Sequence, residues 1–458
     1  MLVDTVIKNG KIVTTEGIFQ AGIAISGERI VAIASSENLP EAAKTIDAKG
    51  NFVIPGLVDP HTHLLYPPTD DWAGILQSET KAAAAGGVTT VIHCLFEAGA
   101  GSIVEAAKKV ITAYEADGYV DLALNASVFN MDQIREMRDA LEYGLSSFKF
   151  LVPYKGREAL AGLPGIDDGI LYMGFKQIGK LVREGYKTFA RIHPESIEVF
   201  FAIEDEAREK GYEPDTYVEV RPNFIELEAL QRCIAFAKVA KCPLFVVHQT
   251  IKEGPEIVAK AKLEGVDIVD ETCPQYLVLN TENTDKMLSK VNPPIRHKED
   301  NEALWRGIQD GIITFMGTDH APVDRAQKGA DFWRAVVGMA GLETWLPVML
   351  SEGVNKGRIT LEKLVEICCY NPAQKYGLAP KKGIIAIGSD ADLAIVDLNK
   401  KAKVSAKNLY TRAGYSCYEG WEFQGWPTLT MLRGKVIASD GKVVGDAGFG
   451  RYVPAEVK

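Results

Sequence analysis

Two histidines one residue apart, His61 and His63, close the apolar run Pro55-Gly56-Leu57-Val58-Asp59-Pro60. Residues i and i+2 of a β-strand point to the same face, so both imidazoles can reach one metal ion where a strand ends. Two histidines near a strand end are, however, more often solvated or bonded to backbone carbonyls. A metal site therefore requires further ligands elsewhere in the chain.

Four more ionisable residues lie in or just after apolar runs of strand length: Lys149, His193, His248 and Asp319. A lone strand-end histidine is usually structural, and Asp319 before His320 could form a turn. Any one of these residues could lie at the end of its strand by accident. If the strands end at the same rim of one barrel, the accidental placement of four histidines and one aspartate there is much rarer, so together they predict a metal site. The remaining histidines are interpreted as structural: His93, His297 and His320.

Lys149 is the most unusual of these residues, because it lies inside the otherwise apolar stretch Ser147–Val152. Burying an ammonium group is costly, and an ion pair with Asp319 or extension of the side chain to the rim would relieve that cost. Alternatively, burial lowers the pKa of the lysine, and the neutral amine takes up CO2. The resulting carbamate offers one oxygen to each of two metal ions, in place of a bridging carboxylate.

The elements that must position these residues are apolar strands alternating with amphipathic helices. The predicted strands are Phe52–Val58, Val88–Cys94, Val120–Ala126, Ser147–Val152, Thr188–His193, Leu244–His248, Val266–Asp270 and Ile312–Gly317. The predicted helices are Trp72–Ala85, Ser102–Ala116, Asp132–Tyr143, Leu171–Glu184, Glu195–Lys210, Phe224–Ala240, Pro255–Leu263 and Asp300–Gln309. Eight such units predict an α/β fold, the (β/α)8 TIM barrel, in which catalytic side chains come from the C-terminal strand ends. An open doubly wound sheet is the alternative, but no GxGxxG follows any of these strands.

The sequence pattern differs at the two ends of the chain, where it predicts short strands and turns and shows no helical periodicity. Because neither end is long enough to bury a core alone, we expect one small β-sandwich domain built from both chain termini. The expected domains are 1–51 for the N-terminal part of the β-sandwich, 52–383 for the metal-dependent barrel, and 384–458 for the C-terminal part of the β-sandwich and the tail.

Charge and composition narrow the class of partner. The 458 residues carry a formal net charge of −10, which gives no basic surface for nucleic acid or anionic lipid and favours a small, weakly charged substrate. No basic start with an apolar h-region opens the chain and no apolar run approaches ~20 residues, so we expect a cytoplasmic protein without membrane contact. Seven scattered cysteines indicate reduced thiols.

The candidate metal-binding and catalytic residues also lie in motifs that resemble those of a known family. The motifs concerned are Asp59-Pro-His-Thr-His63, Phe148-Lys-Phe-Leu-Val-Pro-Tyr-Lys155, His193-Pro-Glu195, Val247-His248, Asn292-Pro-Pro-Ile-Arg296, Gly317-Thr-Asp-His320 and Gly383–Leu393. Over nearly its whole length the chain resembles the cyclic amidohydrolases of the hydantoinase and dihydropyrimidinase branch. Tyr154, five residues after Lys149, is typical of hydantoinases.

The resemblance implies a pair of divalent metal ions. His61, His63 and Asp319 would hold the first ion, His193 and His248 the second, and a CO2-derived carbamate on Lys149 would bridge them. Zinc is the first expectation, with manganese, cobalt or nickel as alternatives. A hydroxide between the ions would attack the ring carbonyl, Asp319 would carry its proton to the leaving nitrogen, and Tyr154 would donate to the oxyanion.

The expected reaction is the opening of a hydantoin or dihydropyrimidine ring to an N-carbamoyl amino acid. Expected substrate-binding residues are Tyr154, Asn292, Leu65 and Phe96. Dihydroorotases carry a carboxylate-binding arginine two residues after the second histidine; here Leu65 occupies that position, which favours uncharged rings. Asn292 and Val337 also depart from the serine and asparagine that are usual in the family, and these departures bear on the substrate assignment rather than on the metal ligands.

Two alternatives remain open. An allantoinase is suggested by Trp72-Ala-Gly74 and disfavoured by Tyr154. A non-catalytic dihydropyrimidinase-like scaffold protein is disfavoured because every ligand position is filled. The family resemblance also implies a homodimer or homotetramer.

Overall fold

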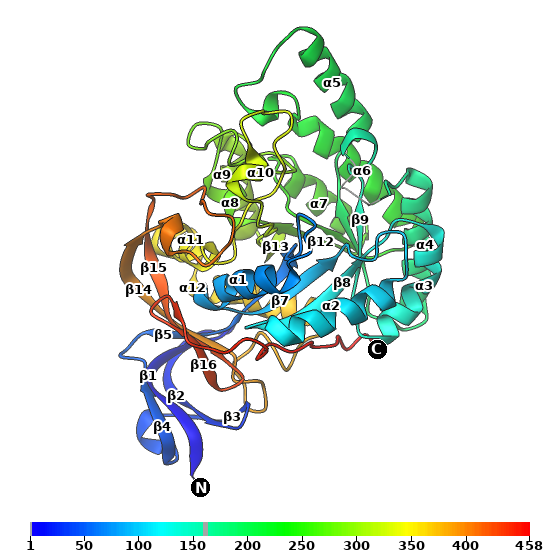
Figure 1. Ribbon diagram of the computed structural model, residues 1–458. Helices are drawn as coiled ribbons and strands as arrows, with labels where there is room; N and C mark the ends of the chain where they lie inside the picture. The colour runs from blue at the N-terminus through cyan, green and yellow to red at the C-terminus, as the bar shows by residue number, and fades with distance from the viewer. Residues whose placement is uncertain (1, 159–163) are drawn as a thin grey trace.

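The computed structural model describes residues 2–158 and 164–458. Two parts make up the molecule: a barrel of parallel strands surrounded by helices, and a smaller sheet to which both ends of the chain contribute (Figure 1). In the described residues, no helix is both long and apolar enough to cross a membrane.

The barrel strands follow one another in sequence order, each parallel to its neighbour. They are β6 (Leu57–Thr62), β7 (Val88–Leu95), β8 (Asp121–Ser127), β9 (Phe148–Leu151), β10 (Ala190–His193), β11 (Leu244–Val246), β12 (Ile268–Thr272) and β13 (Ile313–Met316). Each overlaps one of the eight predicted strands, so the predicted barrel is confirmed.

The first and last strands meet through side chains. Asp59 of β6 accepts hydrogen bonds from the backbone nitrogen of Thr318 at 3.1 Å and from its hydroxyl at 2.5 Å. A parallel bridge joins Thr62 to His320, and the backbone nitrogen of His63 donates to the carbonyl of His320 at 2.7 Å. These contacts fix the end of β6, with the predicted metal-binding residues His61 and His63, against the segment after β13, which carries Asp319.

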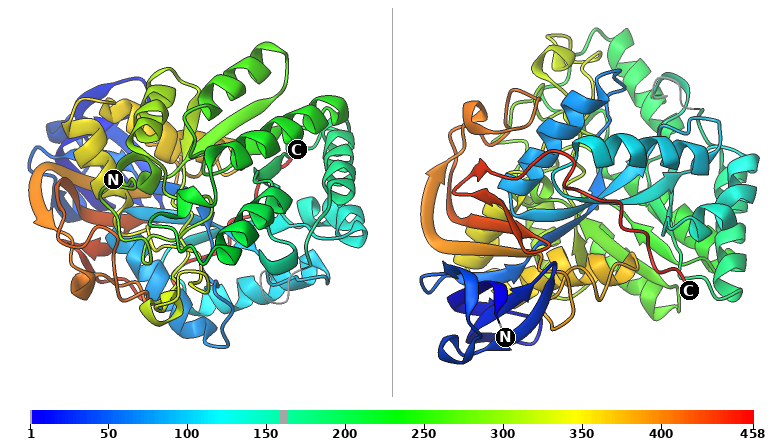
Figure 2. Two further views of the ribbon diagram at one scale, coloured as in Figure 1. Left: turned by 90° about the horizontal axis from the view of Figure 1, so that it is seen from above. Right: turned by 60° about the horizontal axis from the view of Figure 1, so that its bottom comes forward.

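Helices form the outer layer of the barrel (Figure 2). Those that connect the strands are α1 (Trp72–Ala85), α2 (Ile103–Asp117), α3 (Met131–Glu142), α4 (Asp168–Arg183), α5 (Ile197–Glu209), α6 (Asn223–Ala240), α7 (Gly254–Leu263) and α9 (Lys298–Gln309). Side chains of Ser102, Asn130 and Asp167 cap α2, α3 and α4 by accepting from free backbone nitrogens, as expected at helix starts.

Short helices that the sequence pattern did not predict follow β12 and β13. They are α8 (Pro274–Val278), α10 (Arg325–Lys328), α11 (Trp345–Val348), α12 (Leu361–Val365) and α13 (Asn371–Lys375), with π-helical turns over Met349–Asn355 and Glu366–Tyr370. Four or five residues are too few for a hydrophobic period to be recognised.

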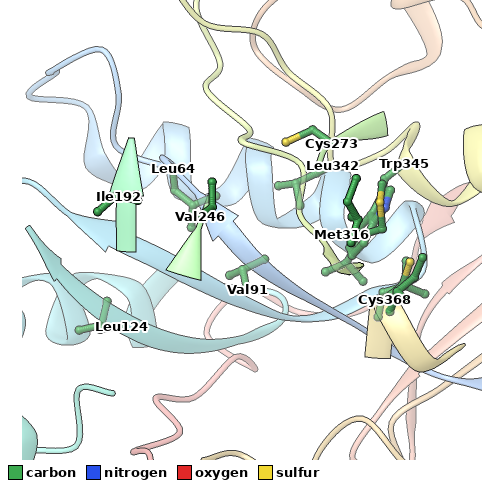
Figure 3. Packing of buried hydrophobic residues seen from close by; sticks show 14 of the residues in the cluster. Leu64, Val91, Leu124, Ile192, Val246, Cys273, Met316, Leu342, Trp345 and Cys368 are labelled. Carbon is green, nitrogen blue, oxygen red and sulfur yellow. The ribbon is translucent and has the colours of Figure 1, made fainter. Parts of the chain in front are cut away.

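Alternation along the strands separates two apolar layers. Leu64, Val91, Leu124, Ile192 and Val246 are buried in the large core cluster that joins the strands and the helices (Figure 3). A second cluster, which includes Phe189, Phe245 and Phe315 together with Tyr376 of the segment after α13, is buried separately. Since strand neighbours point to opposite faces, the residues next to Ile192, namely Arg191 and His193, face the barrel interior.

The small sheet contains β1 (Val3–Val13), β2 (Ile18–Ser26), β3 (Arg29–Ala34), β4 (Ala42–Asp47), β5 (Phe52–Pro55), β14 (Leu393–Lys403), β15 (Glu422–Leu432), β16 (Lys435–Ser439) and β17 (Lys442–Val443). β5 is parallel to β1 on one side and antiparallel to β14 on the other. It therefore joins the two ends of the chain into one β domain, as predicted, with Ile25, Val53 and Leu393 in its core.

The strand predicted over Phe52–Val58 is wrong as a single element. The structure divides it at Gly56, with β5 in the small sheet and β6 in the barrel. A Cβ atom at residue 56 would lie 2.2–2.7 Å from side-chain atoms of Thr89, so only glycine fits where the chain passes between the two parts. We propose that the domain boundary lies here rather than at residues 51–52.

A buried lysine ties the two parts together. The ammonium of Lys382 lies 2.5–2.9 Å from carboxylate oxygens of Asp121, Asp390 and Asp392. Asp121 begins β8 of the barrel, whereas the other two carboxylates precede β14. The three carboxylates could hold a cation, and Lys382 already fills that role.

Candidate metal centre

All six predicted metal-binding residues meet at the C-terminal end of the barrel. His61 lies in β6 and His63 follows it, Lys149 lies in β9, His193 ends β10, and His248 and Asp319 follow β11 and β13. Each is at most 8% exposed. Residues spread over more than 250 positions of sequence are thus brought into one buried cluster.

The first group consists of His61, His63 and Asp319. Oδ1 of Asp319 lies 3.2 Å from Nε2 of His61 and 3.0 Å from Nε2 of His63. One ligand atom from each residue lies within 4.8 Å of the others. Two imidazole nitrogens and one carboxylate oxygen around a common point are donors that a divalent transition-metal ion accepts.

The second group consists of His193 and His248, whose Nδ1 and Nε2 atoms lie 3.0 Å apart. Lys149 connects the groups, because its Nζ atom is 3.0 Å from Nε2 of His61. The ring centroids of His61 and His248 are 5.4 Å apart. The five donors and the lysine therefore surround one small volume rather than two separate sites.

The outward-facing nitrogens show that the histidines are oriented as ligands. Nδ1 of His61 pairs with Oε1 of Glu271 at 2.7 Å, and Nε2 of His193 pairs with Oε2 of Glu195 at 2.7 Å. Each carboxylate fixes the proton on the outer nitrogen and leaves the lone pair of the inner one facing the cluster. The residues present therefore fit divalent metal ions.

Electrostatics in the cluster point the same way. Burial, followed by the positive charges of Lys149 and Arg191, holds the pKa of His61 well below its usual range, so its lone pair stays free. Burial alone would also lower the pKa of His63, but its bonds to Asp319 and Cys94 outweigh this and raise the pKa to about 9. Between His63 and Asp319 the site favours a positive charge, which a bound cation would supply.

Neither simple solution for Lys149 is found in the described residues. It is 1% exposed, so its side chain does not reach the rim, and no carboxylate pairs with its ammonium. Burial and the neighbouring Arg191, which is opposite Lys149 in the sheet, lower the lysine pKa to about 8. The neutral amine is therefore accessible near neutral pH.

The backbone of two of these residues is strained. His248 and Asp319 adopt positive φ values of 41° and 51°, a left-handed conformation that costs residues other than glycine about 1–3 kcal/mol. Both stand where the chain turns away from the end of a strand. The surrounding structure holds them there, which is typical of functional sites.

A small pocket opens above the cluster. Its lining includes Lys149, the histidines at 63, 193 and 248, Asp319, Tyr66, Phe96, Leu151, Tyr154, Val291, Asn292, Ala321, Val337 and Gly338. Phe96 stacks on His63 with ring centroids 4.8 Å apart, and Tyr154 meets His193 edge-on at 5.3 Å. Leu65 does not line this pocket; it is buried in the core, and Tyr66 takes the position at the pocket wall.

Asn292 presents a free acceptor at this wall. Its side-chain nitrogen donates to Glu158 at 3.3 Å, whereas its Oδ1 atom is buried with no partner in the described part of the chain. A buried amide oxygen of this kind is expected to find a donor. An N–H group of a molecule in the pocket would satisfy it.

Three important residues were missed from the sequence. Glu271 and Glu195 orient the two histidines, and the guanidinium of Arg221 holds Glu195 with bonds of 2.6 and 2.8 Å. Burial raises the pKa of Glu195, but Arg221 and His193 overcome this and lower it to about 2. Glu271 lies between Asp270 and Thr272 in β12, so it was not marked as a lone charge in an apolar strand, which was the signal that singled out Lys149.

The other three histidines have structural partners. Nδ1 of His93 accepts from the backbone nitrogen of Leu64 at 3.2 Å. Nδ1 of His320 accepts from Gly341 at 3.1 Å, and its Nε2 lies 3.0 Å from Glu79. His297 stands at the N-terminus of α9. The structure places none of them among the pocket-lining residues.

Comparison with known proteins shows which proteins the chain is similar to. A model of the amidohydrolase family matches residues 228–437. An L-hydantoinase from Paenarthrobacter aurescens is 35% identical, with 98% of each chain covered, and an allantoinase from Bacillus licheniformis is 33% identical, with 98% of this chain and 99% of the relative covered. The solved structure of an L-hydantoinase (dihydropyrimidinase) from Arthrobacter aurescens superimposes with a TM-score of 0.90 at 34% identity, covering 99% of this chain and all of the other.

Proposed function

Since the chain belongs to the hydantoinase and dihydropyrimidinase family of cyclic amidohydrolases, which hydrolyse a C–N bond of a cyclic amide, we propose that it opens 5-substituted hydantoin or dihydropyrimidine rings to N-carbamoyl amino acids. The observation that carries the proposal is the convergence of six candidate metal-binding groups beneath a pocket that Tyr154 lines. The non-catalytic scaffold is disfavoured because the ligand set is complete.

The two groups of donors suit two divalent ions. His61, His63 and Asp319 would hold one and His193 and His248 the other, with carbamylated Lys149 shared between them. We favour zinc, because imidazole-rich sites with carboxylate oxygens suit it. When bound, such ions supply a water-derived nucleophile at neutral pH and polarise the carbonyl that is attacked. Metal analysis of the purified protein tests both the stoichiometry and the metal.

Asp319 and Tyr154 provide the remaining chemistry. Asp319 would accept the proton of the attacking water and pass it to the leaving amide nitrogen. Burial keeps the pKa of Tyr154 well above its usual range, so its hydroxyl remains a donor at neutral pH. That hydroxyl has no partner in the described residues and can stabilise the developing oxyanion.

The walls of the pocket favour uncharged rings. Phe96, Leu151, Val291 and Val337 supply apolar surface, and the unpaired Oδ1 of Asn292 suits a ring N–H. The guanidinium of Arg221 nearby is already paired with Glu195 and is fully buried. Apart from Lys149, which the proposal carbamylates, no guanidinium or ammonium group among the described lining residues would meet a carboxylate carried by the ring, and desolvating that carboxylate without such a partner is costly.

A side-by-side assay of ring substrates tests the proposal. Carbamoyl-product formation is measured with the metal-loaded enzyme for dihydrouracil, a 5-substituted hydantoin, allantoin and dihydroorotate at equal concentration. We expect turnover of the neutral hydantoin or dihydrouracil and little or none of dihydroorotate. A higher kcat/KM for dihydroorotate than for every neutral ring would show that the pocket has been misinterpreted.

Allantoinase is the second candidate, supported by the allantoinases among the relatives and by Trp72-Ala-Gly74. The Tyr154 hydroxyl in the pocket favours the hydantoinase assignment. The same assay separates the two. We also propose that the enzyme is a homodimer or homotetramer, which light scattering of the purified protein would test.

A further inference from the structure

One wall of the pocket is built from two irregular segments that are distant in sequence. Val291 and Asn292 belong to the connection between α8 and α9, and Val337 and Gly338 to the connection between α10 and α11. Neither segment belongs to a strand or a helix at these residues. Something other than secondary structure must therefore fix the shape of this wall.

Two buried lysines join the segments. Lys290, immediately before Val291, is 6% exposed, and its ammonium donates to the carbonyls of Phe332, Ala335 and Trp333 at 2.8, 3.2 and 3.4 Å. An ammonium has three protons, and here three carbonyls of one loop receive them. The rings of Tyr217 and Phe332 lie 5.1 Å from the same nitrogen, within the range of a cation–π contact.

Lys328 completes the connection in the opposite direction. It is fully buried at the end of α10, and its ammonium donates to the backbone carbonyl of Lys290 at 2.7 Å. The same carbonyl accepts from the backbone nitrogen of Gly338 at 3.2 Å. Each segment therefore contributes a lysine that binds the backbone of the other, next to the residues that face the pocket.

Stability alone does not explain this arrangement, because burying two ammonium groups costs free energy of desolvation. Among the described residues neither ammonium has a carboxylate partner, and burial lowers the pKa of Lys290 to about 8 and of Lys328 to about 7. Apolar side chains would fill the same space without desolvating a charge. Lys290, with three carbonyl acceptors, and Lys328, with one, instead fix two loops in one relative position.

We propose that Lys290 and Lys328 are positioning residues for substrate binding, which hold the pocket wall formed by Val291, Asn292, Val337 and Gly338 and thereby set the ring substituent that the enzyme accepts. Neither lysine lines the pocket, so each acts through the backbone that it binds. The kinetic part of this inference rests on the proposed ring-opening function.

The first test replaces Lys290 with methionine, which keeps the length of the side chain and removes its three donors. In the metal-loaded enzyme, Lys290→Met should raise KM for the preferred ring at least tenfold while kcat changes less than threefold and metal content stays the same. The ratio of kcat/KM between a bulky 5-substituted hydantoin and dihydrouracil should change at least fivefold. Lys328→Met should act in the same direction, and the double variant should cost less than the product of the two single effects.

Matched controls separate the pocket wall from general loss of a lysine. Lys262 also donates to a backbone carbonyl, that of Ile312 at 3.2 Å, but at the start of β13 and away from the pocket. Lys262→Met should leave KM and the substrate ratio unchanged. Lys328→Arg retains a donor and should keep KM within threefold of the wild type.

Amide hydrogen exchange provides a test that needs no turnover. Residues 329–338 should exchange faster in Lys290→Met and in Lys328→Met than in the wild type, and not in Lys262→Met. Unchanged exchange together with unchanged KM would overturn the inference, as would an equal fall in kcat and metal content. If Lys290→Met does not fold, Lys290→Gln and Lys328→Met serve the same comparison. If the wild type opens no ring, the proposed function fails, while the exchange data still decide whether the two lysines hold the wall.

Discussion

Removing the hydroxyl of Tyr154 isolates one step of the proposed chemistry. In the described residues this hydroxyl makes no hydrogen bond, and its ring packs edge-on against His193 with centroids 5.3 Å apart. Tyr154→Phe keeps that ring contact and leaves no protein group without its partner. The free energy of unfolding and the metal content should therefore remain close to those of the wild type.

The expected loss is confined to the transition state. One oxyanion donor contributes about 3 kcal/mol, which corresponds to roughly 10²-fold in kcat. Because burial raises the pKa of Tyr154, the hydroxyl is protonated across the neutral range, and the loss should not vary between pH 6 and 8. KM should change much less than kcat, since the bond forms only as charge develops on the oxygen.

The assay measures kcat and KM for the best ring substrate, with metal content and melting temperature determined on the same preparation. Tyr66→Phe is the matched comparison, because Tyr66 lines the same pocket without an assigned role, and it should lose much less. Turnover of Tyr154→Phe at the wild-type rate would refute the oxyanion role. A large fall in melting temperature would instead show that the hydroxyl supports the fold.

Three further predictions concern charged groups. Lys149→Ala should lower metal content and activity together, because the proposed ligand shared by both ions is lost, and metal analysis measures this loss. A short-chain carboxylic acid should partly restore turnover. An unmodified Lys149 amine in an active, metal-loaded enzyme would contradict the carbamate. Asp319→Asn keeps a ligand oxygen but accepts no proton, so kcat should fall strongly while much of the metal is retained. An equal loss of kcat and of metal content would argue that Asp319 is a ligand alone. Glu343 accepts from the backbone of Tyr410 at 2.8 Å, and burial raises its pKa to about 8. The folded state therefore favours its protonated form, and the contribution of Glu343 to stability should be highest below pH 4.5 and decline by up to about 1.4 kcal/mol per pH unit up to pH 8. Urea unfolding of Glu343→Gln should show a smaller decline over this range than the wild type.

The barrel was predictable because most of its strands appear as short apolar runs and its helices are amphipathic, so the two patterns alternate clearly along the chain. The convergence of the predicted metal-binding residues followed from one geometric rule, that strand ends of a barrel share a rim. His193 and His248, 55 positions apart, needed only that rule to be placed side by side.

Errors arose where a local pattern ended. Leu65 was expected in the pocket because it occupies the position of the carboxylate-binding arginine of dihydroorotases, but β6 ends at Thr62, and the backbone nitrogen of Tyr66 donates to the carbonyl of His63 in a turn. The turn brings Tyr66 rather than Leu65 to the pocket. Likewise, Phe52–Val58 reads as one apolar run because the pattern does not reveal that Gly56 passes between two sheets.

The contacts of Lys290 and Lys328 could not be predicted from the sequence. Their partners are backbone carbonyls, which every residue possesses, so no side-chain pattern marks them. A lysine beside a loop usually extends into water. Only the three-dimensional course of residues 329–338 shows that the loop surrounds an ammonium.

The position of β5 in the middle of the small sheet affects how the chain is made. β5 ends at residue 55, and its partner β14 begins at residue 393. At roughly 5–20 residues per second, synthesis of the intervening chain takes roughly 20–70 s. Throughout that time the free edge of β5, with the apolar side chains of Val53 and Ile54, lacks the strand that covers it. The nascent protein therefore carries an open sheet edge, a known template for aggregation, until the barrel has been synthesised.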